Sequence, residues 1–393
     1  MASSSMDILK YFQKREIGSY LRNPHKLIAE RLSHQIPGLF AERQYNIGSI
    51  NKIFASKWVS DRQVVFGTKC NKLVVLDLLS EQMVNLPVLK CSDESRPADC
   101  PCGIHSIAVN PSATLLATGA EHTNDVAVYR LPTFDPVCVG ESGHNDWIFD
   151  IQWLDDEFLV TGSRDSCMAL WCVKDDEDSY VSNMKSLQVP EYTIKKPLTI
   201  KACDNAEKVR ALAYNENVNE LAALSLNAQL HIWDAKTFSK IDTRRLPNPK
   251  ENVCLAIDKE MRMYAIGSQS HVTYIDTRCR KVIKSVLSKQ RGCGIRSVSF
   301  NEKVVTIGTG AGSVLFYDFS AGKYLECNCG HTCMLNVGKG WLREDETYYH
   351  YFMDQDYPNA IYTHCYNDSG TKLFTAGGPL PAGLHGNYCG LWQ

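Results

Sequence analysis

A short strand-like pattern recurs seven times along this 393-residue chain, and no other feature constrains its fold as strongly. Each copy begins with a polar or small residue and continues with alternating small and apolar residues. Alternation with a period of two is typical of a β-strand. The copies are NKIFASKW (51–58), GIHSIAVN (103–110), DWIFDIQW (146–153), KVRALAYN (208–215), ENVCLAID (251–258), GIRSVSFN (294–301) and AIYTHCYN (360–367).

A second pattern follows each copy and consists of an apolar strand, a turn and another apolar strand. The clearest example is FLVTGSRDSCMALW, residues 158–171. Three strands per repeat, with weaker fourth strands between the repeats, predict four-stranded blades. Because a closed ring of blades hides most strand edges, we predict an all-β fold, a seven-bladed β-propeller.

The third repeat resembles a WD repeat, since Gly143-His144 precedes its first strand. In WD repeats a histidine, a hydroxyl residue, a turn aspartate and a tryptophan form a hydrogen-bonded network. The matching residues here are His144, Thr161 or Ser163, Asp165 and Trp171. A turn aspartate that orients a buried imidazole satisfies polar groups that would otherwise lack partners. We therefore expect these residues to stabilise the blade rather than to catalyse a reaction.

The repeats assign residues 42–393 to the propeller. The last repeat runs to Gln393 without a fourth strand, so we expect residues 42–48 to fill that place and close the ring. Two segments interrupt the repeats and are expected to be insertions, 174–207 after the third repeat and 323–359 after the sixth. Function in such folds tends to lie in insertions and loops that the rigid scaffold carries.

Residues 1–41 precede the ring and predict two short amphipathic helices. The apolar residues of the first are Ile8, Leu9, Tyr11 and Phe12, with Asp7 as a cap. The second is expected to begin at Asn23 and Pro24, and its apolar face holds Leu27, Ile28 and Leu32. Such helices dock either on the propeller itself or in a groove of another protein, and the sequence leaves both open.

The 16 cysteines predict free thiols rather than disulfides. They are scattered, and the N-terminal residues are too polar for a signal peptide, so we expect a cytoplasmic and nuclear protein. The cluster CNCGHTC (327–333) has Cys/His spacing that could ligate zinc. It lacks a second, distant pair, so we expect a solvent-exposed loop with free thiols, no metal and no cofactor.

No motif for catalysis is present. The sequence has no P-loop, nucleophile elbow, paired-histidine metal helix or kinase signature. The glycine-rich GTGAG (308–312) lies between strands and lacks the following helix and lysine that phosphate binding requires. A net charge of −2 favours neither nucleic acid nor an anionic membrane, and no apolar run approaches the roughly 20 residues of a membrane span. We expect a non-catalytic binding protein.

Basic side chains recur at equivalent positions of the repeats. They are Lys52, His105, Lys208, Arg210 and Arg296 at the start of first strands, and Lys69 and Arg164 in the turn after second strands. Because first strands line the channel of a propeller, these side chains could converge at one mouth. Convergence favours a compact polyanion, such as a peptide end rich in carboxylates. The alternative is a set of ordinary solvated charges.

Longer stretches carry a closer resemblance. They are FASKWVSDRQVVFGTKCN, GHNDWIFDIQW, KENVCLAI, GIRSVSF, GTGAGSVLFYD, GKGWL and YTHCYNDSGTKLFTAGGPLPAGLHGNYCGLW. Together they resemble the WD-repeat substrate receptors of cullin-4 RING ubiquitin ligases that read acidic, di-glutamate C-terminal degrons, the twelfth of the adaptor-and-cullin-4-associated factors. The resemblance runs from about Ile8 to Gln393.

This resemblance implies a substrate-recognition subunit that catalyses nothing itself. Client proteins that end in Glu-Glu would bind a basic pocket at the mouth, through Lys52, Lys69, His105, Arg164, Lys208, Arg210 and Arg296. The N-terminal helices would bind the propeller-shaped adaptor of the ligase, through Ile8, Leu9, Tyr11, Phe12, Leu27 and Ile28. The Trp-Asp-x-Arg box of many such receptors is degenerate here, because YIDTR (274–278) lacks the Trp and FYDFS (316–320) lacks the Arg.

Two other functions remain open. A non-degradative scaffold for protein complexes is favoured if deletion of residues 1–35 leaves co-purification with the adaptor intact. Nucleic-acid or phosphoinositide binding by the basic positions would show a steep dependence on salt.

Overall fold

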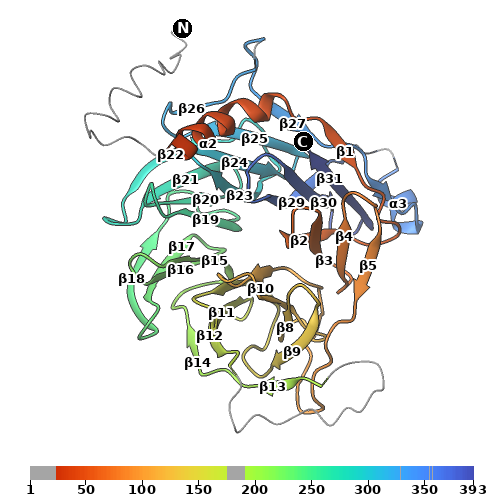
Figure 1. The fold of residues 1–393 in the computed structure, drawn as a ribbon, viewed down its shortest axis with the longest axis vertical. Helices are drawn as coiled ribbons and strands as arrows, with labels where there is room; N and C mark the ends of the chain where they lie inside the picture. Colours follow the sequence, from red (N-terminus) through yellow and green to blue (C-terminus); the bar gives the residue numbers. More distant parts are fainter. Residues whose placement is uncertain (1–23, 175–190, 328, 354, 356) are drawn as a thin grey trace.

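Seven β-sheets follow one another around a common centre in the computed structural model, which describes residues 24–174, 191–327, 329–353, 355 and 357–393 (Figure 1). The first strands of neighbouring sheets pack against one another all the way round the ring. This arrangement confirms the predicted seven-bladed β-propeller. Among the described residues, no helix combines the length and apolarity needed to cross a membrane.

Each of the first three blades has four strands in sequence order from the channel outward. Blade one contains β2 (Ile53–Trp58), β3 (Gln63–Thr68), β4 (Leu73–Asp77) and β5 (Met83–Leu86). Blade two contains β6 (Ile107–Val109), β7 (Leu115–Gly119), β8 (Val126–Arg130) and β9 (Asp135–Gly140). Blade three contains β10 (Ile148–Trp153), β11 (Phe158–Ser163), β12 (Cys167–Cys172) and β14 (Thr199–Ala202).

Blades four and five repeat this plan, and blades six and seven vary it. Blade four contains β15 (Val209–Asn215), β16 (Glu220–Ser225), β17 (Gln229–Asp234) and β18 (Ser239–Arg245). Blade five contains β19 (Cys254–Asp258), β20 (Met263–Gly267), β21 (His271–Asp276) and β22 (Val282–Leu287). Blade six contains β23 (Ile295–Asn301), β24 (Val304–Thr309) and β25 (Ser313–Asp318), and blade seven β29 (Asn359–Tyr366), β30 (Leu373–Pro379) and β31 (Gly386–Trp392).

The two segments expected to be insertions contain parts of blades. Within 174–207, β14 is the outer strand of blade three, and β13 (Thr193–Lys195) adds a parallel fifth strand to blade two. Within 323–359, β26 (Lys323–Tyr324) and β27 (Met334–Asn336) both pair with β25, and β28 (Trp341–Leu342) pairs with β31. These strands have between two and four residues each, so their sequences are too short to show a buried alternation that would reveal them.

The strand β1 (Glu42–Gln44) completes the last blade. Glu42 lies opposite Trp392 and Gln44 opposite Gly390 in an antiparallel pair, as expected for the start of residues 42–48. The backbone N–H of Tyr45 continues the pairing by donating to the carbonyl of Cys389 at 2.9 Å. Tyr388 adds a side-chain bond, its hydroxyl donating to Glu42 Oε1 at 2.6 Å. The ring is therefore closed by hydrogen bonds between segments from opposite ends of the sequence.

Second and third strands are buried on both faces because neighbouring blades pack against them from both sides, as in β24 and β25. Fourth strands such as β18 and β22 are mostly exposed. Within the part of the chain that the structure describes, three short helical elements lie outside the strands: α2 (Pro24–Gln35), the 3-10 turn η1 (Ile36–Gly38) and α3 (Glu346–Tyr351). The helix α2 begins at Pro24, where the sequence predicted it.

Candidate functional site

The polar network of blade three forms as the resemblance to WD repeats implies. His144 Nε2 lies 2.7 Å from Thr161 Oγ1, and Trp171 Nε1 donates to the same oxygen at 2.9 Å. His144 Nδ1 lies 3.3 Å from Asp165 Oδ2. Burial acts to raise the pKa of Asp165, but hydrogen bonds from His144 and from backbone N–H groups bring that pKa below its usual value. Thr161, and not Ser163, is thus the hydroxyl of the network.

Gly143 permits this packing. A Cβ atom at that position would lie 2.3 Å from a ring carbon of Trp171, so only glycine fits beside the indole. The buried frame fixes the turn between β11 and β12, and Arg164 lies in that turn.

One position in the first strands brings side chains from all seven blades to the channel. In β2, β10, β15, β23 and β29 the register with the second strand shifts at this position, which marks a β-bulge. The residues there, together with their counterparts in the other two repeats, are Phe54, His105, Phe149, Arg210, Cys254, Arg296 and Tyr362. We call these seven residues the bulge column. Three of the seven sequence-predicted basic residues belong to it.

Backbone hydrogen bonds join the two groups of basic positions. The N–H of Lys69 donates to the carbonyl of Lys52 at 2.8 Å, so the turn after β3 lies beside the start of β2. Equivalent bonds run from Arg164 to the carbonyl of Trp147 at 2.9 Å and from Leu226 to that of Lys208 at 3.0 Å. The turn residues and the starts of the first strands therefore share one rim, which we call the mouth.

Aromatic rings stack in a row along the mouth. The ring of Phe54 lies 4.6 Å from that of His105, with an angle of 6° between their planes. His105 stacks in turn on Trp147 at 5.9 Å, and the guanidinium carbon of Arg164 lies 4.6 Å from the Trp147 ring. The row holds Arg164 over an aromatic face, where a guanidinium is favoured.

His105 differs from the expectation that placed it among the cations. Burial, with a further contribution from the charge of Arg210, lowers the pKa of His105 to about 3. The imidazole is therefore neutral at pH 7 and acts as an aromatic ring between Phe54 and Trp147. The sequence could not reveal this, because the charge of a histidine depends on its burial.

Arg210 and Arg296 form a second positive region of the mouth. Burial and the neighbouring charge of Arg296 lower the pKa of Arg210 to about 10, so the Arg210 guanidinium remains charged at pH 7. The edge of Phe149 also contacts His105, at 5.1 Å between ring centres, which connects the two regions. Arg296 pairs with Glu251 at 3.2 Å and its side chain is 21% exposed, so it stays within reach of a ligand.

Lys52 and Lys69 hold the turn between β30 and β31. Lys52 Nζ donates to the carbonyl of Pro381 at 2.5 Å, and Lys69 Nζ donates to that of Ala382 at 3.0 Å. Lys52 is only 2% exposed. Burial, and then the nearby charge of Lys69, lower the pKa of Lys52 to about 7. Only part of the Lys52 population is therefore protonated at pH 7, and a nearby anion would favour the protonated form.

Several basic side chains influence the thiol of Cys102, which lies in the connection before β6. Burial raises the pKa of this thiol, while four positive charges act to lower it, those of Lys69, Lys52, Arg164 and Arg210. Lys208 lies on the same rim, where its ammonium is 3.9 Å from a carboxylate oxygen of Glu207. The structure thus gathers Lys52, Lys69, Arg164, Arg210 and Arg296, with neutral His105 among them.

Sequence reasoning missed the aromatic half of the mouth. Phe54, Phe149 and Tyr362 occupy the same column as Arg210 and Arg296, and the Tyr362 ring contacts Phe54 edge-on at 5.2 Å. An alignment of the seven repeats on this one column would have found them. They were overlooked because aromatic residues in strands usually fill the core.

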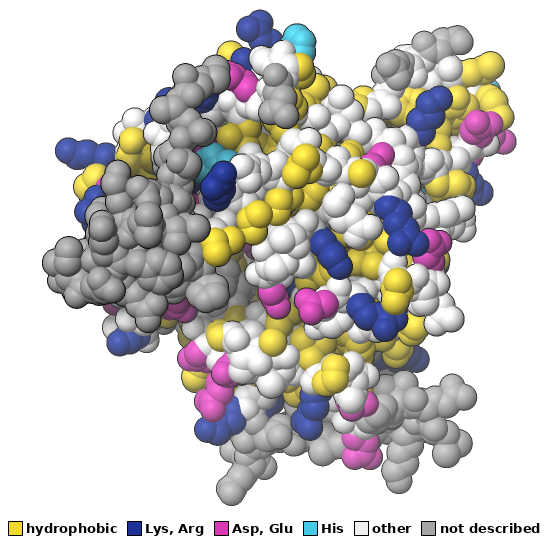
Figure 2. Space-filling model, turned by 45° about the horizontal axis from the view of Figure 1, so that its top comes forward, with side chains coloured by type: hydrophobic (Ala, Val, Ile, Leu, Met, Phe, Trp, Pro, Cys, Tyr) yellow, Lys and Arg dark blue, Asp and Glu magenta, His cyan; other side chains and the backbone are white. Residues whose placement is uncertain are grey.

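Acidic side chains accompany the cations at the mouth. Besides the pairs of Arg296 and Lys208, Arg164 Nη1 lies 3.1 Å from Asp146 Oδ2. These partners lie at half-exposed positions, where ion pairs are weak and exchangeable. Figure 2 shows basic and acidic side chains interspersed over another face of the molecule, in keeping with the small net charge.

The helix α2 is attached to the propeller by its polar face. Lys26 pairs with Glu260, Glu30 Oε2 lies 2.9 Å from Lys303 Nζ, and His34 Nε2 lies 3.0 Å from Asp318 Oδ2. Among the residues expected to bind an adaptor, Ile28 is 54% exposed and Leu27 is partly buried. The other four, Ile8, Leu9, Tyr11 and Phe12, lie outside the described residues.

The helix and the mouth lie on opposite faces of the ring. Glu260 and Lys303 occupy turns between first and second strands, and Asp318 ends the third strand β25. The basic side chains lie at the other ends of the corresponding strands. Since the strands of blades five and six run from one face of the ring to the other, the thickness of the propeller separates the two surfaces.

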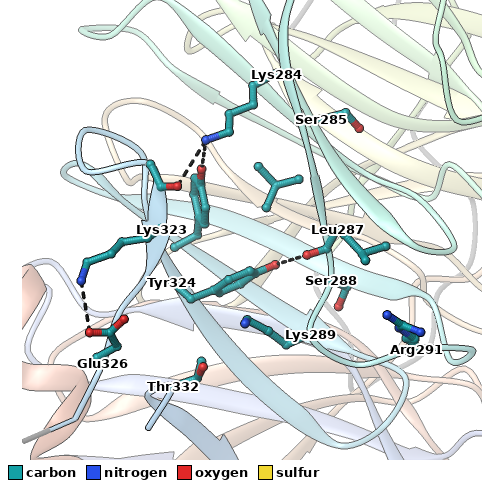
Figure 3. A pocket seen from close by; sticks show the side chains of 13 residues that line it. Lys284, Ser285, Leu287, Ser288, Lys289, Arg291, Lys323, Tyr324, Glu326 and Thr332 are labelled. Atoms are coloured by element: carbon teal, nitrogen blue, oxygen red, sulfur yellow. Dashed lines mark hydrogen bonds and ion pairs between the residues drawn. The ribbon is translucent and has the colours of Figure 1, made fainter. Parts of the chain in front are cut away.

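A separate hollow of about 560 Å³ lies on the outer side of blades five and six (Figure 3). Lys284 Nζ donates to the hydroxyl of Tyr317 at 2.7 Å, and the Tyr324 hydroxyl donates to the carbonyl of Leu287 at 3.0 Å. None of the seven predicted basic residues lines this hollow. It is therefore distinct from the mouth.

The cysteine cluster near residue 330 differs in part from the expected exposed loop. Cys329 is exposed, but Cys333 is 3% exposed and packs in the core between blades six and seven. Cys327 donates its backbone N–H to the carbonyl of His331 at 2.8 Å, which makes the segment a tight hairpin. Cys333 is thus a core residue, because the hairpin folds back onto β25.

Comparisons with known proteins agree with this architecture. A model of the DDB1- and CUL4-associated factor 12 β-propeller matches residues 36–393. Protein HIR1 from two strains of Cryptococcus neoformans var. neoformans serotype D is 27% identical over 149 residues, 35% of this chain and 16% of HIR1. The guanine nucleotide-binding protein subunit beta of Saccharomyces cerevisiae is 27% identical over 183 residues, 44% of this chain and 38% of that protein. The matched regions thus span less than half of these two relatives.

Proposed function

This chain belongs to the DDB1- and CUL4-associated factor 12 β-propeller family, and from that membership we propose that it is the substrate-recognition subunit of a cullin-4 RING ubiquitin ligase. In this role the chain catalyses no reaction. It raises the local concentration of a client protein beside a ubiquitin-charged enzyme. The clients bind through acidic C-terminal degrons that end in Glu-Glu.

The observation that carries this proposal is the position of the basic side chains on one rim, where backbone bonds join Lys69 to Lys52 and aromatic rings hold Arg164 and Arg210. A peptide ending in two glutamates presents three carboxylates within a short length of chain. The guanidinium group of an arginine donates two parallel hydrogen bonds to a carboxylate, and partial burial strengthens each bond relative to water. The aromatic rings keep Arg164 and Arg210 oriented, which lowers the cost of ordering them on binding.

The helix α2 supports the second half of the proposal, attachment to the DDB1-type adaptor. Its polar residues contact the propeller, so the opposite side, with Ile28 at 54% and Leu32 at 37% exposed, remains available. An amphipathic helix that presents an apolar face fits the helix-in-groove mode of recognition. Because α2 and the mouth lie on opposite faces, adaptor and client can bind at the same time.

The proposal is tested with the full-length chain and a labelled peptide ending in Glu-Glu. Fluorescence anisotropy should show saturable binding that is lost when the peptide ends in an amide or carries one extra residue. Equal binding of free and amidated peptides would overturn the proposed recognition of the terminus. An excess of inorganic polyphosphate serves as the comparison for a site that accepts any polyanion.

A scaffold without a role in degradation is the second candidate. The similarity to a G-protein β subunit over 44% of the chain favours it, since that protein is named as a subunit of a complex. Co-purification separates the two functions. When the adaptor no longer binds, a scaffold should still co-purify with its partners and their assembly should be unaffected. For a ligase receptor, loss of the adaptor should stop the ubiquitination of its clients.

A further inference from the structure

A cluster of potential metal ligands lies in blade two, between the turn after its second strand and the connection that precedes its first strand. Cys91, His122 and Asp125 bring a thiol sulfur, an imidazole nitrogen and a carboxylate oxygen within 4.8 Å of one another. His122 Nδ1 and Asp125 Oδ2 are 3.5 Å apart. Tetrahedral zinc with bonds of about 2.0–2.3 Å places its ligand atoms roughly 3.3–3.8 Å apart, so little movement is needed to enclose an ion.

The cluster is buried and one of its oxygens lacks a partner. The Asp125 side chain is 0% exposed, and Cys91 is 6% exposed. Asp125 Oδ2 accepts a hydrogen bond from Ser95 Oγ at 2.5 Å, but Oδ1 has no hydrogen-bond partner. A buried carboxylate oxygen without a donor is costly, and an ion is one of the groups that satisfies it.

The charges around the cluster also favour a bound cation. A second buried carboxylate, Glu141, lies near, and it accepts hydrogen bonds from the backbone N–H and hydroxyl of Ser92 at 2.5 and 2.6 Å. Across the described part of the chain, no lysine or arginine forms an ion pair with Asp125 or Glu141. A divalent cation held by one thiolate, one carboxylate and one neutral imidazole would give a site without net charge.

We propose that Cys91, His122 and Asp125 bind a zinc ion, with an oxygen from Ser95 or from water as the fourth ligand. Sulfur, nitrogen and oxygen together suit zinc better than magnesium or calcium, which prefer oxygen alone. Ser95 Oγ now lies 2.8 Å from His122 Nδ1, so the ion would replace the bonds that this hydroxyl makes. The imidazole is 20% exposed, which leaves a path for the ion to enter.

The site would join two segments of the chain. Cys91 belongs to the connection between β5 and β6, whereas His122 and Asp125 lie in the turn between β7 and β8. The far end of the same connection reaches the mouth, because the carbonyl of Cys100 accepts a hydrogen bond from Trp147 Nε1 and Cys102 follows. Zinc would therefore fix a long connection whose other end shapes the mouth.

The experiment measures zinc in the purified full-length chain by mass spectrometry, after incubation with zinc and removal of the excess. About one zinc ion per chain is expected. Replacement of zinc by cobalt should add the absorption of a cobalt–thiolate bond. Cys91→Ser should remove that absorption, and His122→Gln should lower the zinc content, while Cys203→Ser, at a buried cysteine outside the cluster, should change neither.

Protein without zinc, or with zinc retained in both Cys91→Ser and His122→Gln, would overturn the proposal. A folding defect in the variants is separated by melting the unaltered chain with zinc and with a chelator. The expected result is a lower melting temperature with the chelator, and an unchanged temperature speaks against the site. Cys329→Ser, in the exposed hairpin, controls for zinc held by the other cysteine cluster.

Discussion

The guanidinium carbon of Arg210 lies 3.9 Å from the centre of the Phe149 ring. The two residues belong to neighbouring first strands, β15 and β10, and to the same bulge column. A cation on a partly desolvated ring gains roughly 2 kcal/mol. The ring therefore offsets some of the cost of burying the charge, and it keeps the guanidinium at the mouth before any ligand arrives.

We predict that Arg210→Gln and Arg296→Gln each weaken binding of a peptide ending in Glu-Glu by roughly 10- to 100-fold. The reason is that a hydrogen bond to a charged group contributes about 1.5–3 kcal/mol. Fluorescence anisotropy on the folded variants measures the change. Arg244→Gln is the matched control, because Arg244 is exposed on the outer strand β18 and should leave the affinity unchanged. If Arg210→Gln and Arg296→Gln bind the peptide as tightly as the control Arg244→Gln does, the placement of the site is contradicted.

Binding of the same peptide should weaken as the pH rises from 7 to 8. The pKa of Lys52 in the free protein is about 7, so the lysine loses its proton over this range, while a carboxylate ligand prefers the protonated form. The affinity should fall by up to about tenfold per pH unit above that pKa. Lys52→Met removes the titrating group and should flatten the profile. A profile as steep in the variant as in the original chain would exclude Lys52 as its source.

The same lysine affects the free energy of unfolding. Its pKa is lower in the folded state than the ordinary value of 10.5, so between pH 7 and 10.5 the unfolded chain binds more protons. Burial of charged Lys52 therefore lowers the free energy of unfolding most at pH 7 and below. This destabilising effect decreases as the pH rises from 7 to 10.5, so the free energy of unfolding increases over that range. Denaturant unfolding of the original chain and of Lys52→Met at pH 7 and pH 9 measures the effect. The difference in the free energy of unfolding between the two proteins should be smaller at pH 9.

We predict that Thr161→Val destabilises blade three by about 1–3 kcal/mol. The substitution keeps the shape of the side chain but leaves His144 Nε2 and Trp171 Nε1 buried without their shared partner. Urea unfolding measures the loss. Thr199→Val is the control, because Thr199 lies in the outer strand β14 of the same blade and is only partly buried. A loss no larger at Thr161 than at Thr199 would mean that the network contributes little.

Ile28→Asp with Leu32→Asp should abolish co-purification of the chain with its adaptor while binding of the Glu-Glu peptide is retained. Both residues are exposed on the side of α2 that faces away from the propeller, so the propeller itself should stay folded. Ile241→Asp, at an exposed position of β18, is the matched control. Adaptor binding that survives the double substitution would remove α2 from the interface.

The sequence predicted those parts of the fold where periodic burial leaves a periodic signal. The inner three strands of each blade were found because they are buried, whereas β14, β26 and β27 were taken for insertions because they are short and exposed. The basic positions of the mouth followed from the equivalence of the repeats. The neutral state of His105 did not, since burial determines it. Neither did the approach of Cys91 to His122, which only the folded chain brings together.

The pairing of β1 with β31 also has a consequence for how the protein is made. Contacts between residues so far apart in sequence form late, because the loop between them must be ordered first. The ring therefore stays open until the last strand has been synthesised. Since α2 and η1 directly precede β1, ring closure also holds the helix beside its partners Glu260 and Lys303 on blades five and six. A chain that lacks β31 would therefore leave β1 without its partner strand and blade seven without its third strand.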